Sequence, residues 1–518
     1  MISQTLKLKK LLMSAYLKSA SDVSLIKKAF FFAEKAHKNS KRCSGEPYFI
    51  HPFQTACYLA KLGMDAETIS AGLLHDTIED AGISSKTIEK EFGKNICLLV
   101  EGVTKFKAEE YKEKLDCRSL SLQRLFTASS EDMRVMIIKL IDRLHNAQTL
   151  SYLPEKRRIK VALETLDIYA PIADLLGMNI VKRKLEDLAF ASAYPAEYER
   201  TKEIIGLYLK ENEKMAYELA GNIRKILLAE SLKKFRIEIR IKNIYSAFLK
   251  LEKREWNVDS IYDFIAIRII LKNTTDCYQA LGAIHKRLSH MPGRIKDYFA
   301  FPKQNGYQSL HTTVFTGTGK NLELHIRTED SHRNATFGII SEFSSKKLDI
   351  DEDFFGDKLN FGDLKRFFLE KFSLFRPRKD ANKDYFFKKR KLEYEKIPKW
   401  IKNLAGAELS KKSYDQFIEE IKTNFLNCKI SVFTVNGDMI KLPADSTPID
   451  FAYAMHSDIG NHISKVLINN KKVPIDTNLQ NGDIVEITTE QSRKPLKSWL
   501  NCVKTAIAKR HIRDFLGI

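Results

Sequence analysis

The sequence predicts a multidomain α+β protein with an all-α N-terminal domain, a mixed α/β central domain and a small, β-rich C-terminal module. Three observations support this fold class. The length of 518 residues corresponds to three or four domains of ordinary size. Apolar residues recur at helical spacing from about residue 21 to residue 200, as in SLIKKAFFFAEKAH and TISAGLLHDTIED. Beyond residue 235, β-branched runs alternate with helix and turn signals, which is typical of a mixed domain.

The composition divides the chain into five segments. We expect a helical domain over residues 20–200 and a mixed α/β domain over 201–345, in which SIYDFIAIRIIL and NLELHIRT are predicted strands. Residues 346–427 are rich in lysine and aromatic residues and are expected to form a basic helical connector. Strand and turn signals in KISVFTVNGDMIKLP and GDIVEITTE predict a β module over 428–490, followed by a helical tail over 491–518.

The chain is strongly basic, with a formal net charge of +20. Such a charge suits a polyanionic partner, either nucleotide phosphates or RNA, although lysine-rich solvated surfaces give the same total. The seven cysteines are dispersed and form no CxxC pair, which favours reduced thiols over a disulfide framework or a thiolate zinc site. No apolar run is long enough to span a bilayer and the N-terminus lacks a signal-peptide pattern, so we expect a cytoplasmic protein without membrane contact.

A group of histidine and acidic residues in the helical half predicts a metal site. It has a spaced H…HD…D pattern and a following acidic pair: His51, His75, Asp76 and Asp142, then Glu79 and Asp80. The HD dipeptide is predicted to lie on an apolar helix, where residues four apart share a face and are costly to bury unless a cation neutralises them. Imidazole and carboxylate ligands suit Mn, Fe, Zn or Co better than Ca, and such an ion generates hydroxide near neutral pH. The acidic pair would then serve proton transfer and water positioning.

The segment MPGRIKDYFAFPKQNGYQSLHTTVF predicts a nucleotide-phosphate site in the mixed domain. It gathers basic, tyrosine and histidine side chains: Arg294, Lys296, Lys303, Tyr298, Tyr307 and His311. Basic side chains at this spacing suit phosphate oxygens, and a tyrosine face stacks on a purine, although the segment alone is also compatible with a basic surface loop. Asp263 and Glu323, on predicted strands, supply the carboxylates that a Mg²⁺-dependent transfer from ATP requires.

The motifs SGEPYFIHP, GLLHDTIED, VEGVTKF and IKLIDRLHNAQTL resemble the hydrolase domain of the RelA/SpoT family of alarmone enzymes. This resemblance implies an HD-type domain that removes the 3′-pyrophosphate of (p)ppGpp with Mn²⁺. It implies Mn²⁺ ligands and a catalytic acidic pair at the positions already singled out: His51, His75, Asp76 and Asp142, with Glu79 and Asp80. Four further positions match residues that hold the guanosine nucleotide: Arg42, Ser44, Asn146 and Thr149. Cys43 stands where lysine is common in the family.

The block that follows resembles the synthetase domain of the same family, whose fold is similar to nucleotidyltransferases. The resemblance implies pyrophosphate transfer from ATP to the 3′-hydroxyl of GDP or GTP. Asp263 and Glu323 match Mg²⁺ ligands, and Glu323 also matches the base for the 3′-hydroxyl. The matching ATP-phosphate and nucleotide contacts are Arg240, Lys242, Ser246, Lys250, Arg268, Arg294, Lys296 and Lys303. The implied guanine pocket consists of Tyr307, which stacks on the base, with Asn305, Gln308 and His311.

The synthetase block departs from the family pattern at named positions. Asn243 stands where histidine is usual, and His325 replaces a common glutamine in the ExQIRT strand. The RIKD stretch from Arg294 to Asp297 follows the form found in bifunctional members. We therefore expect both hydrolysis and synthesis, and the alternative is a hydrolase with a decayed synthetase.

The segment VFTVNGDMIKLPADSTPIDFAYAMHSDIG resembles the β-grasp-like TGS domain of the family. In long members this domain contacts uncharged tRNA on the ribosome, so a tRNA or ribosome contact is one expectation, and packing against the catalytic half is the other. Because the chain ends at KRHIRDFLGI, we expect a short form without the ACT domain. Two other functions stay open: a non-catalytic tRNA- or ribosome-binding regulator, and an HD phosphohydrolase that acts on other nucleotides or RNA.

Overall fold

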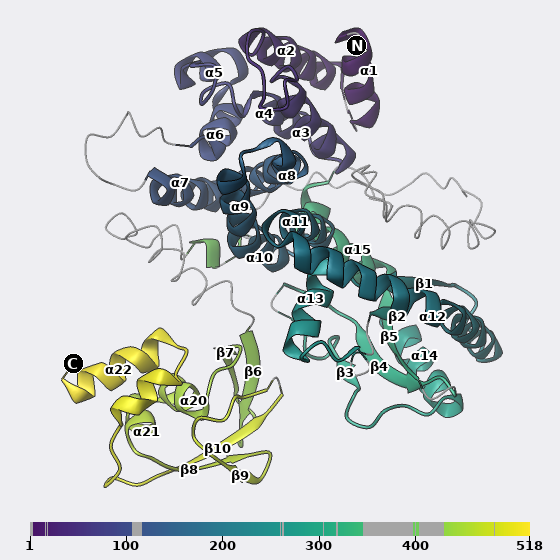
Figure 1. Cartoon of the computed structure of the whole chain (residues 1–518), viewed down its shortest axis with the longest axis vertical. Coiled ribbons are helices and arrows are strands. Elements are labelled where there is room, and N and C mark those ends of the chain that lie inside the picture. The colour runs from purple at the N-terminus through teal and green to yellow at the C-terminus, as the bar shows by residue number, and fades with distance from the viewer. Residues whose placement is uncertain are drawn as a thin grey trace.

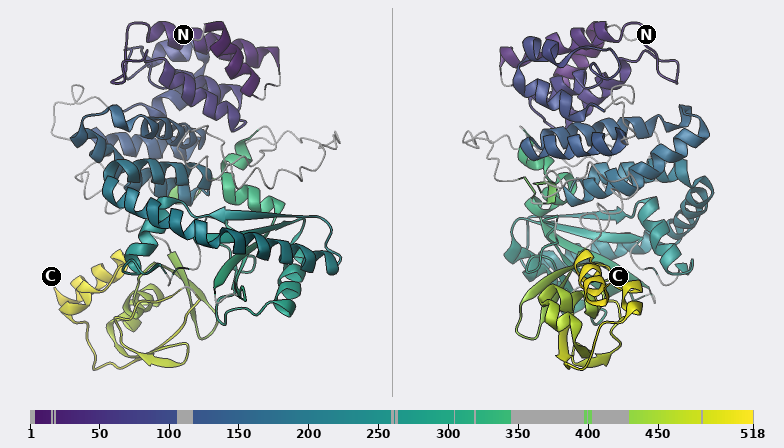
Figure 2. Two further views of the ribbon diagram at one scale, coloured as in Figure 1. Left: turned by 45° about the vertical axis from the view of Figure 1, so that its right-hand side comes forward. Right: turned by 90° about the vertical axis from the view of Figure 1, so that its left-hand side faces the viewer.

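The computed structural model describes residues 4–15, 17, 19–105, 117–258, 261, 264–303, 305–317, 320–344, 397–398, 400–402, 429–480 and 482–517. Three hydrophobic cores lie within them, one in the helical domain, one in a mixed α/β domain and one in the C-terminal module. The helical domain occupies one end of the molecule and the C-terminal module the other, with the α/β domain between them (Figure 1). The same order is visible from the two other directions in Figure 2. The predicted fold class is confirmed.

The N-terminal domain is built of helices around a single core. They are α1 (Gln4–Ser14), α2 (Ala20–Ala36), α3 (Ile50–Lys61), α4 (Ala66–Leu74), α5 (Ser85–Phe92), α6 (Lys94–Val103), α7 (Cys117–Glu131), α8 (Arg134–Gln148), α9 (Glu155–Glu164), α10 (Ala170–Leu175) and α11 (Asn179–Ala193), with a 3₁₀ turn at Leu150–Tyr152 and a π-helical turn at Thr165–Tyr169. Helices α3, α4 and α8 pack against one another. A Cβ atom at Gly72 would lie 2.5 Å from Leu59 Cδ1, so a larger residue there would displace the Leu59 side chain between α4 and α3.

Helix α8 is buried on nearly every side, and several of its buried side chains are ionisable. Its sequence, RVMIIKLIDRLHNAQ, places Lys139, Asp142, Arg143 and His145 among apolar residues, and each of these four is less than a tenth exposed. Charged side chains are rarely buried so completely unless they are paired. The helix therefore carries a network of ion pairs and hydrogen bonds into the centre of the domain.

The structure corrects the prediction that the HD dipeptide lies within a helix. Helix α4 ends at Leu74, and residues 75–81 form turns. His75 Nδ1 lies 2.9 Å from the carbonyl oxygen of Gly72, and Thr77 Oγ1 donates a 2.6 Å hydrogen bond to the carbonyl of Leu74. Such side-chain bonds compete with the continuing helical ladder. They end the helix where His75 enters the centre of the domain.

The α/β domain contains a five-stranded sheet of order β1-β2-β5-β4-β3. Strands β2 and β5 run parallel, and the other neighbouring pairs are antiparallel. The elements are α12 (Pro195–Ala229), β1 (Phe235–Ile241), α13 (Ile244–Lys253), β2 (Ile265–Leu271), α14 (Thr274–Arg287), β3 (Lys296–Asp297), β4 (Leu310–Phe315), β5 (Asn321–Thr328), α15 (Glu329–Phe337) and α16 (Ile340–Phe343). Helices α12 and α14 pack on the sheet. Helix α12 runs through residue 200, where the sequence predicted a domain boundary.

The period-two alternation of side chains divides this sheet into a core face and a polar face. In β5, the side chains of Leu322, Leu324 and Ile326 belong to the hydrophobic core. Glu323 and His325, together with Arg327, alternate with them and therefore lie on the opposite face. In the sheet register, His325 is aligned with Arg268 of β2 and with His311 of β4. The polar face thus brings together residues that are far apart in the sequence.

The C-terminal module has a second five-stranded sheet, of order β7-β6-β10-β8-β9. Its elements are β6 (Lys429–Thr434), β7 (Met439–Pro443), α20 (Pro448–Met455), α21 (Ser457–Asn461), β8 (Ile463–Ile468), β9 (Lys471–Val473), β10 (Ile484–Thr489), a 3₁₀ turn at Lys497–Asn501 and α22 (Ala506–Leu516). The fully buried Asp450 accepts backbone hydrogen bonds from Thr447, Lys504 and Thr505, which joins α20 to the start of α22. Most of the predicted connector over residues 346–427 lies outside the described residues.

No helix among the described residues combines the length and the apolar character that crossing a bilayer requires.

Candidate metal and nucleotide sites

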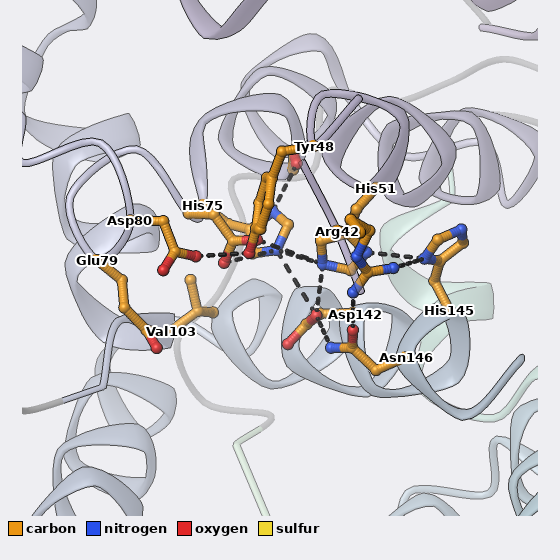
Figure 3. A network of polar contacts seen from close by, with 12 residues as sticks. Arg42, Tyr48, His51, His75, Glu79, Asp80, Val103, Asp142, His145 and Asn146 are labelled. Atoms are coloured by element: carbon orange, nitrogen blue, oxygen red, sulfur yellow. Dashed lines mark hydrogen bonds and ion pairs between the residues drawn. The ribbon is translucent and has the colours of Figure 1, made fainter. Parts of the chain in front are cut away.

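Two histidines and two aspartates from three parts of the helical domain converge on one point; His51, His75 and Asp142 are labelled in Figure 3. Nε2 of His51, on α3, lies 3.0 Å from Asp142 Oδ1 and 3.4 Å from Asp76 Oδ2. Nε2 of His75 lies 3.1 Å from Asp76 Oδ1 and 3.6 Å from Asp142 Oδ1. The two Nε2 atoms are 3.2 Å apart. All four residues are at most 9% exposed, so these polar atoms meet in the interior.

These separations fit a shared divalent ion. Ligand atoms about 2.1 Å from one ion lie roughly 3.0–3.4 Å from each other in octahedral or tetrahedral geometry. One ligand atom from each of His51, His75 and Asp142 lies within 4.8 Å of the other two, and Asp76 borders both imidazoles. A donor set of imidazole nitrogen and carboxylate oxygen suits a transition metal ion.

Contacts at the Nδ1 atoms orient the imidazole rings of His51 and His75. His75 Nδ1 is 2.9 Å from the carbonyl oxygen of Gly72, so Nδ1 carries a proton and Nε2 faces the centre. His51 Nδ1 is 2.7 Å from Nδ1 of His145, a buried residue one turn beyond Asp142 on α8. Such partners at the distal nitrogen are a regular feature of metal-binding histidines. His145 is therefore a positioning residue for His51.

The electrostatics keep both aspartates ionised. Lys139 Nζ lies 3.2 Å from Asp142 Oδ2 and donates to the carbonyl of Val103. Burial alone would raise the pKa of Asp142, but Lys139 and the two imidazoles hold it well below its ordinary value. Burial alone would also raise the pKa of Asp76, but the neighbouring His75 lowers it below its ordinary value. Two negative carboxylates therefore face the imidazole nitrogens at neutral pH.

Tyr48 links this centre to the acidic pair. Its hydroxyl donates to Asp76 Oδ2 at 3.1 Å. It also donates to Asp80 Oδ2 at 2.5 Å (Figure 3). The backbone N–H of Asp80 also donates to the carbonyl of Asp76 at 2.9 Å. Glu79 points away, and its carboxylate accepts a 3.3 Å bond from the backbone N–H of Lys105. Of the acidic pair, Asp80 is the one joined to the centre.

The predicted nucleotide-binding residues of the helical domain form a chain that ends on Asp142. Arg42 donates to Asn146 Oδ1 at 2.6 Å and to Thr149 Oγ1 at 3.3 Å. Asn146 Nδ2 in turn donates to Asp142 Oδ1 at 2.6 Å. Ser44 lies on the same loop as Arg42, where its hydroxyl donates to Glu46. A guanidinium group is thus held at the edge of the metal centre, where it suits a phosphate oxygen.

The polar face of the second domain carries a carboxylate flanked by imidazoles. Glu323 Oε1 lies 3.1 Å from His311 Nδ1, and Oε2 lies 3.3 Å from His325 Nε2. Burial would raise the pKa of Glu323, but its contacts with His311 and His325 lower it below its ordinary value. Glu323 is therefore ionised at neutral pH.

Three arginines line the same face: Arg327 is buried, and Arg240 and Arg268 are half-buried. Burial, reinforced by repulsion from Arg268, lowers the pKa of Arg240 to about 10 and that of Arg327 to about 9. Arg268 Nη1 approaches Glu238 Oε2 at 3.4 Å. Arginines that depress one another's pKa hold positive charge that nearby carboxylates do not fully neutralise. A polyphosphate would relieve this repulsion.

The tyrosine loop borders the polar face. Tyr307 donates or accepts a 2.8 Å bond with His311 Nε2, and Lys303 Nζ lies 5.2 Å from the centre of the Tyr307 ring. Burial would raise the pKa of Tyr307, but His311 and Arg327 lower it to about 7. Asn305 accepts from the backbone N–H of Tyr307 and donates to the carbonyl of Asp174 in the helical domain. The loop is thereby anchored to both domains.

The sequence matches three domain families in chain order. Residues 29–179 match the HD domain, residues 239–348 match a region found in RelA / SpoT proteins, and residues 430–489 match the TGS domain. The chain is 37% identical over 499 residues to a Streptomyces coelicolor protein named GTP pyrophosphokinase, a match that covers 96% of this chain and 56% of that protein. It is 34% identical over 495 residues to the Escherichia coli bifunctional (p)ppGpp synthase/hydrolase SpoT, with 95% of this chain and 65% of SpoT covered.

Along nearly its whole length the chain is similar to members of the RelA/SpoT family. A third relative, from Aquifex aeolicus, is named guanosine-3′,5′-bis(diphosphate) 3′-pyrophosphohydrolase and is 36% identical over 498 residues, which cover 95% of this chain and 64% of that protein. The chain spans between 56% and 65% of the length of these three relatives. The HD domain of the family implies the use of a divalent metal, which agrees with the His51, His75 and Asp142 group.

Other residues singled out by the RelA/SpoT resemblance lie around the polar face or beyond the described residues. Lys242 follows β1, and Ser246 and Lys250 lie on α13. Arg294, Lys296 and Lys303 are exposed, and Gln308 is half-buried. Asp263, the other expected Mg²⁺ ligand, lies outside the described residues.

Sequence reasoning missed several residues that the RelA/SpoT fold places in these sites. Tyr48 gives no signal beyond its place in SGEPYFIHP, because its contact with Asp80 depends on the path of the preceding turn. Lys139 precedes Asp142 by three residues on α8, a helical spacing that does indicate a contact. Arg327 follows Glu323 and His325 at period two, so strand alternation was available as a signal for it.

Proposed function

We propose that the helical domain removes the 3′-pyrophosphate of (p)ppGpp, giving GDP or GTP and pyrophosphate. The observation that carries this proposal is the convergence of two imidazole nitrogens and two aspartates, with contacts of 3.0–3.6 Å, inside an HD domain. The name of the Aquifex aeolicus relative supports the same reaction here. Because the chain spans only part of its relatives, the activity is argued from this site.

The ligands in this proposal are His51, His75, Asp76 and Asp142, and the ion is Mn²⁺. Two imidazoles favour Mn²⁺ over Mg²⁺, which prefers oxygen ligands. Such an ion lowers the pKa of a water molecule that it binds. The chain's own contribution is to hold these donors about 3 Å apart, to keep Asp142 ionised through Lys139 and to orient His75 through the carbonyl of Gly72.

The acidic pair, Glu79 and Asp80, and the hydrogen-bonded residues around Arg42 have the remaining roles in the proposed hydrolysis. The oxygen of water bonds to the phosphorus carried by the 3′ oxygen, and the bond between that phosphorus and the 3′ oxygen breaks. Glu79 and Asp80 transfer the proton of water to the leaving oxygen, with Asp80 held by Tyr48. Arg42 binds phosphate oxygens, while Ser44, Asn146 and Thr149 border the nucleotide.

In the second domain, we infer pyrophosphate transfer from ATP to the 3′-hydroxyl of GDP or GTP, with AMP as the other product. The support is the polar face, which carries ionised Glu323 together with Arg240, Arg268 and Arg327. Glu323 accepts the proton of the 3′-hydroxyl, and the arginines bind the phosphates of ATP. The role of Asp263 as its partner for Mg²⁺ stays a prediction. The relatives named GTP pyrophosphokinase support this reaction.

A hydrolase-only function is the second candidate, and one observation favours it. Both oxygens of Glu323 face imidazole nitrogens, at 3.1 and 3.3 Å, and are thus engaged in the absence of substrate. Two assays separate the candidates. The purified chain is given ppGpp with Mn²⁺, and release of GDP and pyrophosphate is measured; it is then given ATP and GDP with Mg²⁺, and ppGpp is measured. Bifunctionality predicts product in both, and hydrolysis alone selects the second candidate.

Binding of tRNA or the ribosome through the TGS domain stays a prediction, as does the cytoplasmic location. In this domain Asn461 accepts a 2.9 Å bond from the Tyr453 hydroxyl, and His462 Nδ1 lies 2.9 Å from the carbonyl of Arg493. Both side chains therefore have contacts within the domain. Filter binding of labelled uncharged tRNA to the chain tests this contact.

A further inference from the structure

Three side chains on the polar face of the second domain form a cluster of metal-ligand type. One ligand atom from each of His311, Glu323 and His325 lies within 4.8 Å of the other two. Each carboxylate oxygen of Glu323 faces one imidazole nitrogen, at 3.1 Å for His311 and 3.3 Å for His325. These separations are close to the roughly 3.0–3.4 Å between ligands of one ion. The cluster offers two nitrogens and a carboxylate.

His325 supplies a buried nitrogen that makes no hydrogen bond of standard geometry to the described residues, although a Glu323 carboxylate oxygen lies 3.3 Å away. The residue is 4% exposed, and its Nε2 has no hydrogen-bond partner among the described residues. The 3.3 Å approach to Glu323 therefore lacks hydrogen-bonding geometry. A cation that accepts the lone pair of this nitrogen would satisfy this buried polar atom.

His311 has the outer contact that metal-binding histidines usually carry. Its Nε2 lies 2.8 Å from the hydroxyl of Tyr307, on the side of the ring away from Glu323. With an ion bound, the ring proton would lie on Nε2 and be donated to Tyr307, so that the lone pair of Nδ1 could bind the ion beside the Glu323 carboxylate.

The cluster is accessible to ions from solvent, and its two imidazole rings can rotate. The Glu323 side chain is 22% exposed, which leaves a path for an ion from solvent. The His311 and His325 rings are stacked, with centroids 3.9 Å apart and planes at 18°. To bind one ion in the plane of each ring, the two imidazoles must rotate about their terminal side-chain torsion, which is soft in histidine.

We propose that His311, Glu323 and His325 bind a divalent transition metal ion of the Mn, Co or Zn class, more tightly than Mg²⁺. Mg²⁺ takes oxygen ligands, whereas two imidazoles favour borderline transition ions. The proposal deepens the inferred synthetase function, because Glu323 is its expected base and Mg²⁺ ligand. Ion binding is nevertheless measured without nucleotide or turnover. Its failure is therefore distinguishable from failure of either activity.

The test counts Co²⁺ ions on the full chain after chelator treatment, by equilibrium dialysis and by the visible absorption of bound Co²⁺. The His75→Asn variant removes a ligand of the helical site, so the second cluster is observed alone. We expect about one Co²⁺ per chain in this background. Adding His325→Gln should weaken Co²⁺ binding by more than about 100-fold. Loss of a residue that only orients a ligand weakens metal binding by about 10–100-fold, so a larger effect identifies His325 as a ligand.

His285→Gln is the matched control in the same background. His285 lies on α14 and contacts Thr312, outside the cluster, so its replacement should leave the bound Co²⁺ unchanged. Equal Co²⁺ affinity with and without His325→Gln would overturn the proposal, as would displacement of Co²⁺ by an equal concentration of Mg²⁺. If circular dichroism shows that the His325→Gln protein is unfolded, Glu323→Gln in the same background is measured against the same expectation.

Discussion

Replacing Asp142 with asparagine removes one negative charge from between two imidazoles and a buried lysine. Asp142 Oδ2 lies 3.2 Å from Lys139 Nζ, and both side chains are 6% exposed. Removal of one partner from a buried ion pair costs about 3–5 kcal/mol, because the other charge stays buried without compensation. We expect Asp142→Asn to lower the free energy of unfolding of the metal-free protein by about that amount. Mn²⁺-dependent hydrolysis should fall to background, because the ion loses a charged ligand.

The double variant Lys139→Met/Asp142→Asn separates the effect on the fold from the effect on the site. Removing both partners of a buried pair is often close to neutral, so most of the lost stability should return. Hydrolysis should not return, because the negative ligand is still missing. Urea unfolding of the chelated protein, followed by circular dichroism, measures the first effect, and release of pyrophosphate from ppGpp measures the second. Parent-level hydrolysis in either variant would refute the assignment of Asp142 as a ligand.

Three further predictions follow from other contacts. Tyr48→Phe should reduce kcat for ppGpp hydrolysis by about 10–100-fold with little change in KM, because a hydrogen bond to a charged group contributes about 1.5–3 kcal/mol; a changed KM with normal kcat would place Tyr48 in substrate binding instead. Glu323→Gln should stop ppGpp synthesis and spare hydrolysis, and synthesis at the parent rate would show that the carboxylate is not the base. Burial raises the pKa of Glu186 to about 7, so ionisation of this carboxyl destabilises the fold as pH rises from its ordinary value through 7. Glu186→Gln should therefore raise the free energy of unfolding near pH 8 by up to about 3 kcal/mol and leave it nearly unchanged near pH 4.5, whereas an equal gain at both values would contradict this reasoning.

The metal centre was predictable because the residue types and their spacing in the sequence indicate a metal site. Two histidines and two aspartates within apolar segments require compensation, and the structure places all four within contact distance. The helical assignment of the HD dipeptide was wrong for a local reason. Thr77 and His75 bond to carbonyls of the last helical turn, and apolar periodicity carries no information about such bonds.

The polar face of the sheet was only partly predictable. Alternation in NLELHIRT separates Glu323 from its core neighbours, but the approach of His311 depends on the register of β4 against β5. Register is set by pairing across the whole sheet, so one strand's sequence does not reveal which residue lies opposite. The same limit applies to Asn305, whose contact with Asp174 joins two domains that are far apart in the sequence.

The central claim is that one divalent ion, bound in the helical domain, makes this chain a (p)ppGpp hydrolase. The most direct measurement adds Mn²⁺ in small increments to the chelator-treated His325→Gln chain and follows the release of GDP from ppGpp. We predict that the rate rises with added Mn²⁺ and levels off near one ion per chain, and that Asp76→Ala on the same background yields no GDP at any Mn²⁺ concentration. GDP release at the full rate before any Mn²⁺ is added, or undiminished release by the Asp76→Ala protein, would contradict the claim.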